Sequence, residues 1–173
     1  MPSDRPGRVE PVFVWGIDPG LSRCGYAVLE PRGRSSRVVA MGVLTTPASD
    51  PVPRRLHALQ QDIRALAADH PPAEVAIERI LFSVNVRTAI GVAQAAGVVM
   101  TEAVDAGAAV TEYSPNEIKQ AVTGDGAADK QQVEAMVQRL LRIDKPIRPV
   151  DAADAAAIAL CHVAHVPFRT KVG

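Results

Sequence analysis

The chain has 173 residues, which suits one domain with a sizeable core, and 47% of its residues are hydrophobic while 3% are aromatic. Lysine and arginine together number 19, as do aspartate and glutamate, so the zero formal charge excludes a protein coated in positive charge but not a local nucleic-acid surface. Two cysteines are too few for a disulfide framework, and the sequence has no run of about 18 apolar residues for a membrane span. These totals, with an N-terminus that lacks an apolar signal core, favour a cytoplasmic protein with no membrane partner and two buried free thiols.

The chain is expected to divide into three parts. Residues 1–11 are polar and proline-rich, which predicts a flexible N-terminal arm. A single folded domain is expected over residues 12–167, and residues 168–173 then form a C-terminal tail.

Three apolar segments predict the first strands of the domain. Residues 12–18 are apolar on both faces, as in a strand buried in the middle of a sheet. Residues 25–31 and 37–44 predict two more strands joined by a turn at 31–34, so the domain opens with an antiparallel meander. The remaining elements are, in order, a helix between Pro53 and His70, a strand at 74–78, a helix of about 20 residues ending near Gly107, a strand at 108–113, a short helix with a capping box at Ser114 and Glu117, and helices at 130–143 and 151–165.

This order of elements predicts the fold class. Three meandering strands, followed by strands joined through helices, make an α/β protein with a five-stranded mixed sheet flanked by helices on both faces, the layout of the ribonuclease H-like fold. The helix at 130–143 is amphipathic, and its inward face is expected to carry Val133, Met136, Val137, Leu140 and Leu141.

Four acidic residues from separate segments are candidates for one site. Asp18 and Glu78 each end a strand expected in the sheet interior, so both emerge at the same edge if the strands are parallel neighbours. Asp151 and Asp154 are three residues apart at the start of the last helix, on one face of it. Taken singly, Asp18 also suits a turn and the aspartate pair suits a helix cap. Together, four acids at one edge repel each other and lose hydration, so the cluster requires cations or protons.

Ligation by carboxylates alone suits Mg²⁺ or Mn²⁺, since no cysteine or histidine set competes. Two such ions activate a water and stabilise the leaving oxygen in phosphodiester hydrolysis. The four acids therefore predict a site with two Mg²⁺ ions, for which Mn²⁺ substitutes.

Five segments carry a family resemblance when taken in order; they read GIDPG, AIER, NVRTAIGVAQAAGV, EYSPNEIKQAVTGDGAADKQQV and DAADAAAIAL. Over about residues 12–165 the chain resembles the bacterial Holliday junction resolvases of the Ruv system, the crossover junction endodeoxyribonucleases. The resemblance implies a homodimer that resolves four-way DNA junctions by paired symmetric nicks in recombination and repair, together with the branch-migration proteins RuvA and RuvB. It also implies that the catalytic, metal-binding acids are Asp18, Glu78, Asp151 and Asp154. Some relatives have histidine at the Asp151 position; aspartate here leaves an all-oxygen site.

The resemblance also implies residues that contact DNA. Lysines at the positions of Lys119 and Lys130 serve DNA binding and catalysis in the family, although each alone also suits a solvated surface charge. Arg79, directly after the glutamate, and Arg87 are further candidates by their location.

An apolar wedge is expected in the loop after the fourth strand. Similar proteins often place an aromatic residue three positions after the glutamate; here that position is Leu81, and the aromatic residue is Phe82. Either side chain is a candidate to meet unstacked bases, and packing of both into the core is the alternative.

The long helix has a stripe of small residues, Ala89, Ala93 and Gly97, which fits either packing on its own sheet or contact with a second copy. Three other functions remain open: a related nuclease acting on another nucleic acid, a non-enzymatic junction-binding protein, and an ATP-using phosphotransferase that shares the three-strand opening.

Overall fold

The centre of the molecule is a five-stranded mixed sheet with the strand order β3-β2-β1-β4-β5. The computed structural model describes residues 11–80 and 86–166. Strands β2 and β3 run antiparallel to their neighbours, whereas β1, β4 and β5 are parallel to one another. The predicted mixed sheet is therefore confirmed. The strands are β1 (Phe13–Asp18), β2 (Arg23–Arg32), β3 (Ser35–Thr45), β4 (Pro72–Glu78) and β5 (Ala109–Tyr113).

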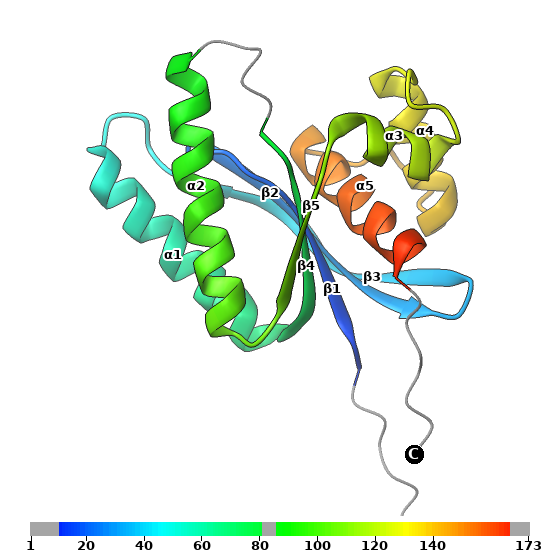
Figure 1. Cartoon of the computed structure of the whole chain (residues 1–173), viewed down its shortest axis with the longest axis horizontal. Helices are drawn as coiled ribbons and strands as arrows, with labels where there is room; N and C mark the ends of the chain where they lie inside the picture. The colour runs from blue at the N-terminus through cyan, green and yellow to red at the C-terminus, as the bar shows by residue number, and fades with distance from the viewer. Residues whose placement is uncertain (1–10, 81–85, 167–173) are drawn as a thin grey trace, which may run out of the picture.

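Helices cover both faces of the sheet (Figure 1). On one face lie α1 (Val52–Asp69) and α2 (Val86–Asp105). On the other lie α3 (Pro115–Thr123), α4 (Lys130–Leu141) and α5 (Val150–His165). Each layer has its own apolar core. No helix within the described parts of the chain is both long and apolar enough to cross a membrane.

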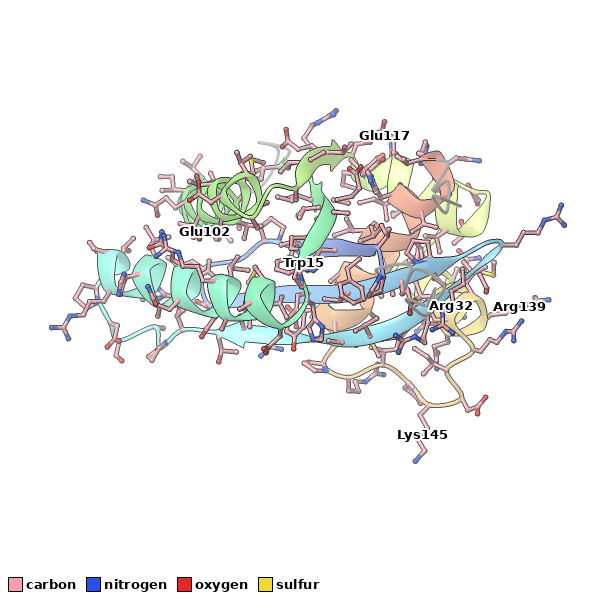
Figure 2. The ribbon with its side chains drawn as sticks, turned by 90° about the horizontal axis from the view of Figure 1, so that it is seen from below. Trp15, Arg32, Glu102, Glu117, Arg139 and Lys145 are labelled. Atoms are coloured by element: carbon pink, nitrogen blue, oxygen red, sulfur yellow. The ribbon has the colours of Figure 1, made fainter. Side chains whose placement is uncertain are left out.

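The strand β1 lies between the two cores because its residues are buried on both sides. Trp15 is 1% exposed, and its indole N–H donates a hydrogen bond to the backbone oxygen of His70 at 3.1 Å. Figure 2 shows this side chain in the middle of the molecule. The uniformly apolar segment thus forms the central strand, as its composition predicted.

Helix α5 lies unusually close to the sheet because glycines face it. A Cβ atom at Gly16 would overlap the backbone oxygen of Ala155, and one at Gly25 would overlap the backbone oxygen of Asp151. Most of the side chains that α5 turns to the sheet are alanines. Small residues on both partners therefore allow the helix backbone to approach β1 and β2 closely.

Several local predictions are confirmed and two are wrong. Ser114 and Glu117 form the predicted capping box at the start of α3. Both cysteines are buried and free. Leu140, however, is 42% exposed, because Val137 and Leu141 already form the buried side of α4 and the helical rotation turns Leu140 away from it. The helix also ends at Leu141 rather than at residue 143, with Arg142 as its C-cap in the left-handed region at φ 55°.

Candidate active site

Two of the candidate acids are the last residues of neighbouring parallel strands. Asp18 ends β1 and Glu78 ends β4. Ile17 and Ile77, the residues directly before them, are partners in the β1–β4 register. The two carboxylates therefore leave the sheet side by side at its carboxyl edge, where open α/β sheets carry their chemistry.

The other two acids reach this edge on α5. Asp151 and Asp154 lie in its first turns, and the close approach of the helix at Gly25 brings this end over the start of β2. Gly25 is also the register partner of Asp18. The glycine-dependent packing of α5 thus fixes the position of these acids relative to the strand ends.

A cleft of about 430 Å³ opens at this edge. Three of the predicted acids, Asp18, Glu78 and Asp154, line it together with Lys119 and Lys130. Its apolar wall is formed by Pro115, Ile118, Val133, Ala157 and Ile158. The structure thus brings together five predicted site residues from β1, β4, α3, α4 and α5.

Burial and mutual repulsion disfavour the ionised form of the carboxylates in the cleft. Burial, and then the negative charges of Glu78, Asp154 and Asp151, raise the pKa of Asp18 from 3.8 to about 7, against a smaller opposite effect of Lys130. Burial and Asp154 likewise raise the pKa of Glu78. A cation in the cleft would therefore be bound favourably, because it stabilises the ionised forms of Asp18 and Glu78.

Two basic side chains hold the acids of α5. The Lys130 ammonium lies 2.9 Å from Oδ2 of Asp154, and this hydrogen bond raises the pKa of Lys130. Arg23 donates to Oδ2 of Asp151 through Nε at 3.1 Å and Nη2 at 2.8 Å, which lowers the pKa of Asp151. Asp151 does not line the cleft in this arrangement.

Arg23 was not among the residues predicted from the sequence. The available signal was its position five residues after Asp18, at the start of the antiparallel strand that returns from the same sheet edge. Only the packing of α5 reveals its partner, because Arg23 and Asp151 are 128 residues apart in sequence.

The acids suit hard divalent cations by donor chemistry, but they are not assembled as a ligand set. Among the residues that the structure describes, no group of three or more histidine, cysteine, aspartate or glutamate side chains is arranged to hold a metal ion. One oxygen of each α5 carboxylate is instead paired with a basic side chain, that of Asp151 with Arg23 and that of Asp154 with Lys130. The donor set fits Mg²⁺ or Mn²⁺ once these side chains exchange partners.

Among the other predicted DNA contacts, Arg79 is the residue whose side chain the structure describes. Arg79 is exposed outside the cleft, its backbone N–H donates to the oxygen of Tyr113 at 2.7 Å, and its guanidinium donates to the oxygen of Glu112 at 3.4 Å. Leu81 and Phe82 lie outside the described residues. Arg87 belongs to α2, but its side chain also lies outside the description.

Beneath the cleft, α5 is tied to the sheet by polar contacts within the core. His162 is fully buried, with Nδ1 2.9 Å from the Tyr113 hydroxyl and Nε2 3.5 Å from a carboxylate oxygen of Glu74. His162 is therefore a core residue of α5 two turns away from Asp154.

Cys24, also buried, lies on β2 near Asp18, and its burial is the main reason that the pKa of its thiol is raised to about 12.

Comparisons with known proteins agree with the family resemblance of the sequence. The family model of crossover junction endodeoxyribonuclease RuvC matches residues 14–162. The RuvC protein of Salinispora arenicola is 51% identical over 160 residues, which cover 92% of this chain and 91% of that protein. The RuvC protein of Syntrophomonas wolfei is 42% identical over 150 residues, 87% of each chain.

Solved structures extend the comparison to three dimensions. Thermus thermophilus RuvC in complex with a Holliday junction substrate superposes with a TM-score of 0.84 at 33% identity, over 89% of this chain and 94% of that one. The yeast mitochondrial Holliday junction resolvase Ydc2 shares the fold alone, with a TM-score of 0.63 at 15% identity over 90% and 81% of the two chains. The ribonuclease H-like fold is thereby confirmed. By sequence and by structure, the chain belongs to the RuvC family of crossover junction endodeoxyribonucleases.

Proposed function

We propose that the protein is a structure-selective endonuclease that resolves four-way (Holliday) DNA junctions by paired symmetric nicks, in homologous recombination and DNA repair. The observation that carries this function is the cleft in which Asp18, Glu78 and Asp154 face Lys119 and Lys130. Carboxylates from three distant segments, next to two lysines, suit the binding of cations and of a phosphodiester in one place.

The catalytic acids of this proposal are Asp18, Glu78, Asp151 and Asp154. Family membership implies a nuclease that depends on divalent metal ions. We assign two Mg²⁺ ions to each site, with Mn²⁺ as a substitute, because the donors are all carboxylate oxygens. Such ions, when bound, activate a water molecule and neutralise charge on the leaving oxygen.

The chain's own residues prepare the cleft for this chemistry. Asp18, on the rigid central strand, is a fixed carboxylate whose high pKa of about 7 reflects unneutralised crowding. Before cations bind, Lys130 pairs with Asp154 and Arg23 pairs with Asp151, so each of these acids has a positively charged partner. Lys119 lines the cleft, and so does Lys130, whose ion pair with Asp154 would open when DNA binds. Both lysines are then positioned to bind phosphate oxygens of the DNA strand.

Further DNA contacts in this proposal come from the neighbourhood of Glu78. Arg79 follows it in the chain and is exposed. Arg87, Leu81 and Phe82 remain proposed contacts on the basis of the family resemblance, with Phe82 as the candidate to stack on unpaired bases.

A homodimer is part of the proposal because symmetric nicks require two sites related by a two-fold axis. The small-residue stripe of α2 does not serve its own sheet: Ala93 and Gly97 are exposed, and a Cβ at Gly97 would have no described atom within 4 Å. Val86 and Ile90 on the same helix are 73% and 55% exposed. An exposed apolar helix face with small residues suits close packing against its copy.

Partners and location follow from the same activity. We propose that the dimer works with the branch-migration proteins RuvA and RuvB, as its family resemblance implies, and that it acts in the cytoplasm, where bacterial chromosomal DNA lies. The ATP-using phosphotransferase alternative is set aside by family membership. A non-enzymatic junction-binding protein would have no need of the cleft acids, and a nuclease for another nucleic acid would differ in substrate.

The test compares a synthetic four-way junction with a linear duplex of the same base composition, each with Mg²⁺ or with a chelator. Paired nicks are expected only when the junction and Mg²⁺ are both present. Equal cutting of the duplex would favour the nuclease with another substrate, and junction binding without any cutting would favour the non-enzymatic protein.

A further inference from the structure

The end of the molecule remote from the cleft carries a second positively charged surface. The turn between β2 and β3 brings Arg32, Arg34 and Arg37 together, and the end of α4 adds Arg139 and Arg142 beside them; we call these residues the arginine patch. Figure 2 shows Arg32 and Arg139 at the same end of the molecule. A groove of about 370 Å³ joins the two elements and is lined by Arg32, Arg37 and Arg142 among others.

The charges of the patch are largely uncompensated. Glu30 pairs with Arg32 at 3.0 Å and with Arg37 at 2.7 Å, and these contacts lower the pKa of Glu30. Within the described parts of the chain, Arg34, Arg139 and Arg142 form no ion pair, and all three are exposed. Glu30 thus pairs with two of the five arginines of the patch, and the formal net charge of the whole protein is zero.

The backbone conformation of Arg142 is uncommon for a residue with a side chain. This residue caps α4 in the left-handed region at φ 55°, where glycine is the residue that avoids strain. The sequence instead places a long cationic side chain there, next to the groove. A cation at a helix C-terminus also interacts favourably with the helix dipole, and here it adds positive charge beside the groove.

The chemistry of the patch fits a phosphodiester backbone. All five cations are arginines, whose planar guanidinium groups bind phosphate oxygens in pairs. The groove also has apolar lining residues, Val38, Leu140, Leu141 and Ile143, of which Leu140 is the most exposed at 42%. The guanidinium groups at its rim are the groups that a phosphodiester backbone would bind.

The distance to the cleft fits the same ligand. Strand β2 begins with Arg23, which holds Asp151 of the candidate active site, and ends with Arg32 of the patch. Its ten residues span about 30 Å at roughly 3.3 Å per residue. Along α4, whose 12 residues begin with Lys130 of the cleft and end just before Arg142, the distance is about 18 Å at roughly 1.5 Å per residue. The patch thus lies about 18 to 30 Å from residues of the candidate site, a length that one strand of a duplex covers in about five to nine base pairs.

We propose that the arginine patch binds the phosphate backbone of a junction arm about half to one helical turn away from the cut site. The inference rests on the proposed function, since it requires a duplex arm that leaves the cleft. It adds a contact that depends on the length of that arm.

The test is the salt dependence of junction binding in a chelator, so that the DNA is not cut. The variant is Arg34→Gln, Arg139→Gln and Arg142→Gly combined; glycine at position 142 removes the charge and also the backbone strain. With hairpin-capped arms of about 15 base pairs, the slope of log affinity against log salt should fall by about 2 to 3 for each protomer, or about 5 for the proposed dimer, with an affinity loss of about tenfold or more. The control, Arg34→Lys with Arg139→Lys, keeps the charges and should keep the slope.

Arm length gives the decisive comparison. Capped arms of about six base pairs reach about 20 Å, past the α4 end of the patch but short of Arg34 in the turn between β2 and β3, so the variant should lose less affinity for such a junction than for the long-armed one. An unchanged slope with long arms, or an equal loss with short and long arms, overturns the proposal, and the first result would leave an acidic protein as the ligand of the patch. Nicking of the same long-armed junction by the wild type with Mg²⁺, run in parallel, reports separately on the proposed function.

Discussion

The four acids of the candidate site fall into two groups, two that end strands and two that pair with exposed basic side chains. Asp18 and Glu78 are fixed by β1 and β4, and burial raises the pKa of both. Asp151 and Asp154 instead have basic partners that are half-exposed or more, 49% for Arg23 and 67% for Lys130. Exposed ion pairs are weak, so these two partners are the parts of the site that move most easily.

Replacing Asp18 by asparagine separates binding from cutting. In the variant Asp18→Asn, nicking of a four-way junction should fall by at least about a thousandfold, because the central cation-binding carboxylate of the proposed site is lost. Junction affinity in a chelator should stay within about threefold, since Lys119 and Lys130 remain. Gel assays of nicking and of binding measure the two effects, and full nicking by the variant would contradict the assignment of Asp18.

The same residue predicts a pH dependence of stability without metal. The folded state holds the pKa of Asp18 at about 7 instead of 3.8, so between these values it binds more protons than the unfolded chain. Stability therefore falls as pH rises from about 4 to 7, and the loss is complete above pH 7. Urea unfolding in a chelator should show Asp18→Asn more stable than wild type by about 2 to 4 kcal/mol at pH 8 and nearly equal at pH 4.

Arg23 is expected to compete with metal ions for Asp151. The variant Arg23→Gln frees the carboxylate, so Mn²⁺ should bind the DNA-free protein up to about fivefold more tightly, the limit set by an exposed ion pair. Electron paramagnetic resonance of free Mn²⁺ measures the affinity. Arg23→Lys keeps the positive charge and serves as the control; affinity that is unchanged or weaker in Arg23→Gln would show that the ion pair does not oppose metal binding.

Among the elements, α5 decides the geometry of the site. It lies against β1 and β2 at Gly16 and Gly25, where no side chain separates the two backbones. The polar contacts of His162 with Tyr113 and Glu74 tie the same helix to β5 and β4. The acids of α5 are therefore positioned by contacts along the whole helix rather than by its first turn alone.

The variant Gly16→Ala tests this packing. The added methyl group would overlap backbone atoms of Ala155 and Ala159, so α5 must shift. We expect a loss of about 3 kcal/mol or more in the free energy of unfolding, measured with urea, and weaker nicking by the remaining folded protein. Gly91→Ala is the matched control, because its Cβ would meet only Leu21 at 3.5 Å or beyond and should cost less than about 1 kcal/mol.

The sequence allowed the elements and the acids to be predicted because those signals are local. An apolar run that ends in an acid, a capping box and an Asp pair at a helix start each lie within a few residues of one another. Partners set by tertiary packing gave no such signal: the ion pair of Arg23, the contacts of His162 and the outward turn of Leu140 all depend on how α4 and α5 dock. The roles of the site residues stay predictions until they are measured.

At the scale of the whole molecule, separate surfaces serve separate proposed contacts. The cleft lies at the carboxyl edge of the sheet, the arginine patch lies at the far end of β2, and the exposed face of α2 lies on the opposite helical layer (Figure 1). This separation means that oligomerisation, catalysis and remote DNA contact are open to independent mutation.

The dimer proposal is tested on α2. Ile90→Lys puts a charge on the exposed apolar face, so self-association should weaken by roughly thirtyfold or more while the monomer stays folded. Light scattering after size-exclusion chromatography measures the mass. Leu140→Lys, the same kind of change at an exposed position of α4, should leave the dimer intact; a dimeric Ile90→Lys protein would place the interface elsewhere.

The covered thiol of Cys24 has a consequence for metal choice. With its pKa near 12, the sulfur beside Asp18 stays protonated throughout the physiological pH range. Soft ions such as zinc or cadmium gain most of their affinity from a sulfur ligand, and Cys24 is fully buried and does not line the cleft. The anionic donors among the described residues of the cleft are all carboxylate oxygens, so burial of this cysteine leaves a thiophilic metal without a sulfur ligand there.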